Sequence, residues 1–323
     1  MSKKKATAQT GTIKVEKKSL KTRIWNNRGF YIMFLPVLAF LIITQYWPML
    51  GIRYAFTTYT PAMAARGIAP EFVGFKHFIK LFSESGFWTS FVNTLELSIL
   101  KLLITTFASV VVSILLNEMM NLFAKKILQT VIYLPHFMSW VVTASIFTLI
   151  LHPGPNGMVN GLLKDAGIIT DSIYFLGDTG WWRPIYYLIN IWKEVGWGTI
   201  IFLATLSGIN PELYEAADID GATRFQKMRF VTLPALANTI ITVLILNLAK
   251  VMNLFESVFV LYNDRVRDVS DVVATYIYRQ TFLQTLPDYG YSTAVGLFRS
   301  MVGCVLVVVC NWASKKVRGR GIV

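Results

Sequence analysis

The sequence predicts an all-α integral membrane protein with six transmembrane helices and with both termini in the cytoplasm. Three observations lead to this fold class. Hydrophobic residues make up 54% of the 323 residues and charged residues only 15%, whereas soluble domains carry about a quarter charged residues. Six apolar runs are long enough to cross a bilayer, which takes about 20 residues of helix. The net charge of +13 gathers at the edges of these runs, which is typical of membrane orientation rather than nucleic-acid binding.

The chain begins with a basic tail, residues 1–28, which contains nine Lys or Arg and one acid, Glu16. This composition predicts a polar cytoplasmic segment. The apolar run 29–50 follows, and we expect it to be the first span. A cleaved signal peptide is the alternative, with Ala62-Met63-Ala64 as a weak cleavage signal. The run is too long for that, however, and it ends more than ten residues before the signal.

Five further apolar runs follow along the chain and predict the remaining spans. These spans lie at about 90–116, 131–151, 184–206, 235–261 and 292–312. We therefore expect one transmembrane domain over residues 29–312 and a short cytoplasmic tail over residues 313–323.

The distribution of Lys and Arg predicts the orientation of the spans. With the N-terminus inside, the tails and inner loops hold 18 of these residues, and the longer outer loops hold nine. This excess agrees with the positive-inside rule. Two cytoplasmic ends require an even number of spans, which agrees with six. The orientation also places the loop 207–234 in the cytoplasm.

This loop, residues 207–234, is a polar segment between two apolar runs. Pro211 suits the first position of a helix, and Asn210 before it is a favourable cap. Gly221 is expected to end the helix. The sequence therefore predicts a short helix of about ten residues, roughly 15 Å long, whose carboxylates and small alanines are exposed to another surface.

The spacing of this loop resembles the EAA loop of ATP-binding-cassette (ABC) importer permeases. The matching residues are Glu215, Ala216, Ala217, Gly221, Leu233 and Pro234. In that family the loop is a coupling helix, which docks into a cleft on a separate ATP-hydrolysing subunit. The resemblance implies coupling roles for Glu215, Ala216, Ala217, Asp220 and Gly221. The alternative is an ordinary amphipathic connector on the membrane surface.

Three more segments extend the resemblance to permeases for complex sugars: residues 134–140 (LPHFMSW), 192–198 (WKEVGWG) and 218–222 (DIDGA). The resemblance covers most of the chain from about Phe30 to Trp312. It is closest to the polysaccharide and oligosaccharide branch of type I importers, which includes the alginate importer permease. It implies the type I importer permease fold, a multi-pass location in a bacterial plasma membrane and import of an oligosaccharide, either acidic or neutral.

The resemblance also implies partners. Such importers combine two different permease subunits, two ATPase subunits and an extracytoplasmic solute-binding protein, in contact with membrane lipid. We expect ATP and Mg to bind to the ATPase subunits, and no cofactor to bind to this chain, because it lacks the Gly-x-x-x-x-Gly-Lys-Ser/Thr phosphate cradle. The three histidines show no metal-site spacing, and no catalytic constellation stands out. The sequence therefore predicts neither an enzyme nor a metal centre.

Polar side chains inside the predicted spans are the candidates for a substrate path. A charge at membrane depth costs several kcal/mol unless it faces a cavity or a partner. On each of the spans 184–206 and 235–261, a helical wheel gathers polar residues within about 120°. The predicted path residues are Asn190, Trp192, Lys193, Trp197, Asn247, Lys250, Asn253 and Arg299.

These residue types suit an oligosaccharide. Asn and Lys donate to sugar hydroxyls or carboxylates, and Trp192 or Trp197 could stack on a sugar ring. An excess of Lys and Arg along the path favours an acidic sugar such as a uronate. The alternative is that these residues pair with one another or with the second permease, or that their charged ends reach the membrane interface.

Two rival functions stay open at this point. A secondary transporter driven by an ion gradient needs carboxylates at mid-membrane, for which Glu194 and Glu256 are the candidates, but it leaves the loop 207–234 unexplained. A membrane-bound enzyme lacks a catalytic constellation. Co-purification with ATPase subunits would separate the ABC permease from both rivals.

Overall fold

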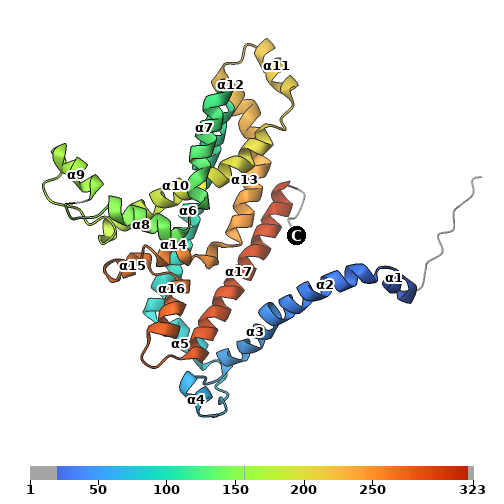
Figure 1. Cartoon of the computed structure of the whole chain (residues 1–323), viewed down its shortest axis with the longest axis vertical. Coiled ribbons are helices and arrows are strands. Elements are labelled where there is room, and N and C mark those ends of the chain that lie inside the picture. Colours follow the sequence, from blue (N-terminus) through green and yellow to red (C-terminus); the bar gives the residue numbers. More distant parts are fainter. Residues whose placement is uncertain (1–19, 156, 319–323) are drawn as a thin grey trace, which may run out of the picture. The chain divides into compact units, whose positions relative to one another are not determined.

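The computed structural model describes residues 20–155 and 157–318, and this part of the chain is helical. It contains no β-strand, and its one β-bridge joins Thr57 and Phe72. The chain divides into two compact units, residues 1–52 and 53–323 (Figure 1).

The first unit consists of α1 (Leu20–Asn26), α2 (Arg28–Leu41) and α3 (Trp47–Met49), with a π-helical stretch between α2 and α3. Apolar side chains cover all sides of α2 after its first residues, and no residue of α2 is buried. A helix that is apolar all round is typical of a membrane span. The stretch Arg28–Phe56 is indeed long and apolar enough to cross a membrane.

The second unit is built on four long helices, α6 (Ser85–Asn117), α10 (Thr179–Leu206), α13 (Leu233–Leu248) and α17 (Tyr289–Arg318). Shorter helices connect them. These are α4 (Pro61–Ala65), α5 (Lys76–Ser83), α7 (Leu122–Tyr133), α8 (Trp140–Ile150), α9 (Met158–Asp165), α11 (Pro211–Ile219), α12 (Arg224–Lys227), α14 (Glu256–Phe259), α15 (Arg267–Ser270) and α16 (Val273–Tyr278).

Four stretches of the described residues are long and apolar enough to cross a membrane: Arg28–Phe56, Ser85–Asn117, Arg224–Leu248 and Tyr289–Lys316. The predicted span 131–151 is instead a bent pair, Leu122–Phe137 and Trp140–Ile150, with an angle of 104° between its parts. It would make a fifth span. Length and composition therefore support four or five spans rather than six.

The predicted span 184–206 lies in α10, which is helical but does not reach the hydropathy of the other spans. Lys193 and Glu194 lie in its middle and lower its mean hydropathy. The predicted span 235–261 is also different, because α13 ends at Leu248 and a short helical turn follows. Ser98 on α6 donates a hydrogen bond of 2.8 Å to the Val251 carbonyl oxygen in this turn. The Ser98 hydroxyl thus takes the place of the backbone N–H that would bond this carbonyl in a continuous helix.

The helix α10 lies along α6 and also packs against α7. Two glycines allow this close approach. A Cβ atom on Gly196 would lie 2.4 Å from the Ile132 carbonyl oxygen of α7, and one on Gly198 would lie 2.3 Å from Ser109 Oγ of α6. Only glycine fits at these two contacts, and α10 is thus held between two helices.

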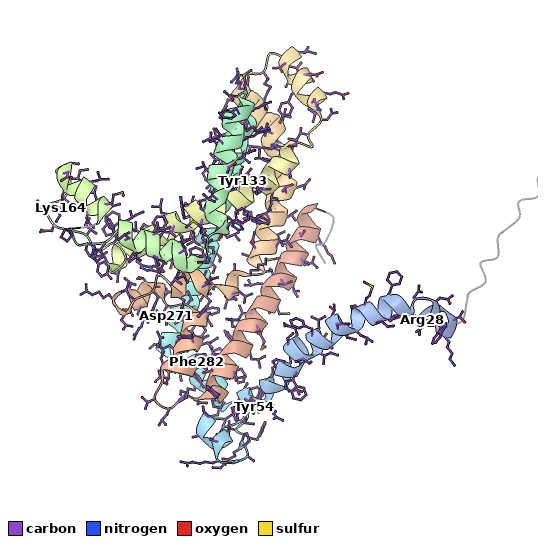
Figure 2. The ribbon with its side chains drawn as sticks, viewed as in Figure 1. Arg28, Tyr54, Tyr133, Lys164, Asp271 and Phe282 are labelled. Atoms are coloured by element: carbon purple, nitrogen blue, oxygen red, sulfur yellow. The ribbon has the colours of Figure 1, made fainter. Side chains whose placement is uncertain are left out.

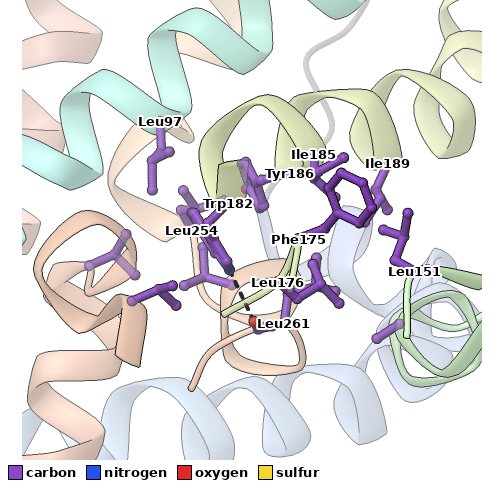
Figure 3. Close-up of a cluster of buried hydrophobic side chains, with 14 of the residues drawn as sticks. Leu97, Leu151, Phe175, Leu176, Trp182, Ile185, Tyr186, Ile189, Leu254 and Leu261 are labelled. Carbon is purple, nitrogen blue, oxygen red and sulfur yellow. Dashed lines mark hydrogen bonds between the residues drawn. The ribbon is translucent and has the colours of Figure 1, made fainter. Parts of the chain in front are cut away.

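A buried cluster surrounds the first half of α10 (Figure 3). Trp182 and Tyr186 are fully buried and stacked, with ring centroids 5.1 Å apart. Trp182 Nε1 donates a hydrogen bond of 3.1 Å to the Leu261 carbonyl oxygen, and the Tyr186 hydroxyl shares one of 3.0 Å with Ser257. The cluster therefore fastens the segment after α13 to α10.

The segment from α15 to α16 is attached to α6 by a buried carboxylate, Asp271 (Figure 2). Asp271 accepts hydrogen bonds from Ser90 at 2.8 Å, from Thr275 at 2.7 Å and from Arg279 at 2.6 Å. A buried carboxylate is stable only when it is paired and hydrogen-bonded. This network therefore fixes the connection between α14 and α17 on the bundle.

Candidate functional site

The predicted short cytoplasmic helix is α11, Pro211–Ile219. The Asn210 side chain caps it by accepting a hydrogen bond of 3.1 Å from the Glu212 amide, and Pro211 occupies the first turn. Glu212 lies beside the N-terminus, where the helix dipole favours a negative charge. The local sequence thus determines where this helix starts.

Gly221 ends the helix as predicted. Its φ angle is +74°, in the left-handed region that glycine adopts without strain. The amide of Gly221 donates to the Asp218 carbonyl at 3.1 Å, and that of Ala222 donates to the Ala217 carbonyl at 2.9 Å. The chain then reverses into α12, which begins with a capping box between Thr223 and Gln226.

Two contacts attach α11 to the segment that leads into α13. Lys227 Nζ lies 2.7 Å from Asp218 Oδ1. The Tyr214 hydroxyl shares a hydrogen bond of 3.0 Å with Thr232, which is buried. Because one contact comes from each turn of α11, the short helix is held at two points rather than one.

The residues predicted to couple to an ATPase lie on the outside of this helix. Glu215, Ala216, Asp220 and Gly221 are exposed, and Ala217 is half-buried. Sequence reasoning did not include Leu213 and Ile219, which are apolar and exposed on the same helix, at 53% and 87%. The signal for them in the sequence was their position, Ile219 inside the motif and Leu213 two residues before it. Together, these residues present a small surface with an apolar and an acidic part.

A cavity of about 530 Å³ lies between α6, α10 and α13. It contains four of the eight predicted path residues: Trp197, Asn247, Lys250 and Asn253. Its polar lining also includes Ser98, Lys101, Thr105, Thr106, Ser109 and Glu194. The predicted path omitted the α6 residues. They repeat at helical spacing within an apolar run, which marks one face of α6 as polar but does not show which helix that face meets.

Two of the predicted path residues lie outside the helix that was expected to carry them. Lys250 and Asn253 lie beyond the end of α13 at Leu248. The helical-wheel argument therefore does not apply to them, although both line the cavity. Both residues face the cavity because the turn after α13 is attached to α6 through the Ser98–Val251 hydrogen bond.

The other four predicted path residues do not line this cavity. Asn190 is fully buried and donates to the Tyr186 carbonyl within α10. Trp192 packs edge-on against Phe147 of α8. Lys193 is buried and binds carbonyl oxygens at the bend between α7 and α8. Arg299 is half-buried on α17.

Residues 109–319 match the family model described as "binding-protein-dependent transport system inner membrane component". Because this match covers more than half of the chain, the protein belongs to that family. The short helix α11 and the cavity residues of α10 and α13 lie within the match, whereas most cavity residues of α6 precede it.

The individual relatives and solved structures agree with this family. The polygalacturonan/rhamnogalacturonan transport system permease protein YteP of Bacillus subtilis (strain 168) is 40% identical over 311 residues, which cover 96% of this chain and 94% of the relative. The arabinooligosaccharides transport system permease protein AraP of the same organism is 26% identical over 97% of this chain and 99% of its own length.

Among solved structures, a chain of a bacterial ABC transporter involved in the import of the acidic polysaccharide alginate superimposes with a TM-score of 0.83. It is 36% identical, and the match covers 93% of this chain and 99% of that chain. The protein is therefore an inner-membrane permease subunit of a type I ABC importer, of the branch that transports carbohydrates. The family is a transport component and not an enzyme, and its members belong to ABC importers, in contrast to the two rival hypotheses of a membrane-bound enzyme and a secondary transporter.

Proposed function

We propose that this permease forms the translocation path for acidic oligosaccharides, and that ATP hydrolysis in separate subunits drives the transport. The observation that carries this proposal is the charge of the cavity. Two ammonium groups, Lys101 and Lys250, line it together with one carboxylate, Glu194. An unpaired positive charge at membrane depth is costly in free energy unless an anion binds to it.

The rest of the lining suits a sugar chain. Asn247, Asn253 and the hydroxyl groups of α6 donate to and accept from sugar hydroxyls. Trp197, which is half exposed, offers a ring face for stacking. The relatives support the acidic class, because polygalacturonan and alginate are both polymers of uronic acids. The arabinooligosaccharide relative supports a neutral substrate as the second candidate.

We further propose that α11 is the coupling helix, with Glu215, Ala216, Ala217, Asp220 and Gly221 at the contact with an ATPase subunit. The two contacts from Tyr214 and Asp218 join α11 to the start of the segment that continues as α13. The far end of α13 lines the cavity through Asn247. A movement of α11 on ATP binding is thereby transmitted to the cavity wall, so that the ATPase state biases two arrangements of the helices.

The proposed assembly follows from the family. A second permease subunit, two ATPase subunits that bind ATP and Mg, and an extracytoplasmic solute-binding protein complete the importer. A solved alginate ABC transporter, in complex with a periplasmic protein that carries an alginate pentasaccharide, supports the last partner. In this arrangement the chain crosses the membrane six times, with α10 as a span shielded by its neighbours and with both termini in the cytoplasm.

The test is transport by the complete importer in proteoliposomes, with oligogalacturonides, alginate pentasaccharide and neutral arabino-oligosaccharides as substrates. We expect uptake of an acidic oligosaccharide. Lys101→Gln should raise its KM about tenfold, because a charge-assisted hydrogen bond contributes about 1.5–3 kcal/mol. Lys164→Gln, on exposed α9, is the matched control and should have the wild-type KM. Preferential uptake of the neutral sugar would refute the acidic class.

A further inference from the structure

Two segments that the sequence singled out, residues 134–140 and 192–198, are joined to each other in the structure. The first contains the bend between α7 and α8, and the second lies in the middle of α10. We call residues Leu134–Ser139 the elbow. The elbow does not line the cavity, whereas Glu194 and Trp197 of the second segment do.

The elbow is clamped to α10 by Lys193. This buried ammonium donates to the carbonyl oxygens of Pro135 at 3.4 Å, His136 at 3.1 Å and Met138 at 2.5 Å. An ammonium group has three donors, and each finds one carbonyl of the bend. The Trp140 ring lies 5.3 Å from the same nitrogen. Lys193 therefore holds the elbow and is fully occupied in doing so.

His136 contacts two of the cavity residues on α10, Trp197 and Glu194. Its ring is stacked on Trp197, with centroids 5.1 Å apart and an interplanar angle of 14°. Its Nδ1 atom lies 3.2 Å from Glu194 Oε2, the distance of an ion pair when the ring is protonated. His136 thus lies behind two side chains that face the cavity.

The position of the His136 ring relative to α10 is fixed by backbone contacts. Gly196 allows α10 to touch the backbone of Ile132 and Tyr133, just before the elbow. Together with the Lys193 clamp, this contact leaves the elbow little freedom to slide. A ring held in this way restricts the rotamers of the half-exposed Trp197, and a restricted side chain loses less entropy when a ligand stacks on it.

We propose that the elbow positions Trp197 for oligosaccharide binding, and that His136 is the positioning residue through its stacked ring. The inference rests on the proposed function, since it assumes that a sugar enters the cavity. It assigns a role to both segments that the coupling helix leaves unexplained. It also distinguishes the roles of two lysines, because Lys193 holds the elbow in place while Lys101 faces the cavity.

The experiment is a double-mutant cycle between His136 and Trp197 in the complete importer, measured as KM and maximal rate of uptake of oligogalacturonides and alginate pentasaccharide. We expect His136→Ala to raise KM about three- to tenfold, the size of one lost aromatic stacking interaction, with a maximal rate within about twofold. Trp197→Ala should raise KM at least as much. The double variant should be no worse than Trp197→Ala, because the two residues act as one unit.

His152→Ala, in the loop after α8, is the control and should behave as the wild type. His136→Phe keeps a stacking ring, and its KM should stay within about twofold of the wild type. If the importer with His136→Ala does not assemble, His136→Phe still tests the inference. An unchanged KM in His136→Ala, multiplicative effects in the double variant, or a several-fold rise in His136→Phe would overturn the inference. If the wild-type importer transports neither acidic probe, the proposed function fails instead.

Discussion

Single residues in this protein have roles that depend on their surroundings more than on their type. Lys193 and Lys101 are both lysines in apolar surroundings. Lys193 binds three carbonyl oxygens and is buried, whereas Lys101 lines the cavity. The first is a structural cross-link, because its charge is met by carbonyl dipoles. The second is available to a substrate.

At the residue scale, Gly221 gives the sharpest prediction. No atom beyond its chain neighbours lies within 4 Å of a Cβ placed there, so the effect of a side chain comes from its φ angle of +74° alone. Gly221→Ala should cost about 1–2 kcal/mol in the turn, and Gly221→Pro more, since proline requires a φ near −65°. We expect lower sugar uptake per ATP hydrolysed, with normal membrane insertion, in proteoliposomes.

The matched control is Gly208→Ala in the same loop, where a Cβ atom would meet its nearest neighbour, the Thr205 carbonyl oxygen, at 3.5 Å, an ordinary contact. It should retain the wild-type coupling ratio. An equal loss in both variants would show that the loop tolerates no substitution, and normal coupling in Gly221→Pro would contradict the coupling role of α11.

At the scale of elements, α10 is the helix around which the second unit is built. It is held between α6 and α7, it carries the Lys193 clamp, and it contributes Glu194 and Trp197 to the cavity. Its charged residues Arg183 and Lys193 find partners on α6 and on the elbow, which explains how a helix of modest hydropathy can be buried. The same packing leaves α13 and α17 more exposed than α6.

The close contact between α10 and α7 predicts the effect of a single methyl group. Gly196→Ala would place a Cβ atom 2.4 Å from the Ile132 carbonyl oxygen. Alanine favours a helix by up to ~1 kcal/mol over glycine, but overpacking costs about 1–3 kcal/mol, so we expect net destabilisation. The thermal unfolding midpoint of the importer in detergent should fall by about 2–4 °C per kcal/mol.

Gly303→Ala on α17 is the control for this change, because a Cβ atom there would meet nothing within 4 Å. Its midpoint should be unchanged or slightly higher, as helix propensity alone then acts. A midpoint for Gly196→Ala that equals the wild-type value would mean that the two helices separate easily, and that the elbow is not rigid.

At the scale of the whole molecule, the question is how many times the chain crosses the membrane. Four described stretches satisfy length and composition, and the bent pair would make a fifth. The proposed six spans require α10 to cross as well, protected by α6 and α7. The excess of Lys and Arg in the predicted inner loops agrees with an even number.

Cysteine labelling tests this arrangement. In a chain with Cys304→Ala and Cys310→Ala, single cysteines replace Glu118, Lys164 or Lys316, all of which are exposed. A membrane-impermeant maleimide on intact cells should label only the cysteine at position 164, and all three positions after the membrane is opened. Labelling at position 118 or 316 in intact cells would refute the proposed topology.

The helix α11 could be predicted from the sequence because its signals are local. Asn210, Pro211 and Gly221 set its beginning and its end within about a dozen residues. The cavity could be predicted only in part. The α10 residue Trp197 was identified by its type, but Lys101 becomes significant only when α6 lies beside α10. Helical periodicity describes one helix and contains no information on its neighbours.

The breaks in the predicted spans show the same limit. The bend after Pro135 has a local cause, because proline disrupts a helix. The end of α13 at Leu248 contains neither Pro nor Gly. It depends on the hydrogen bond from Ser98 and on the buried cluster around Trp182.

The sequence by itself determined that this protein is a helical membrane protein and where the short helix α11 begins and ends, because hydropathy and capping act along the chain. Only the tertiary structure decided which polar side chains share a cavity, and that Lys193 holds the elbow instead of facing the substrate. The physical reason is that a polar group in an apolar environment must find a partner, and packing between distant helices selects that partner.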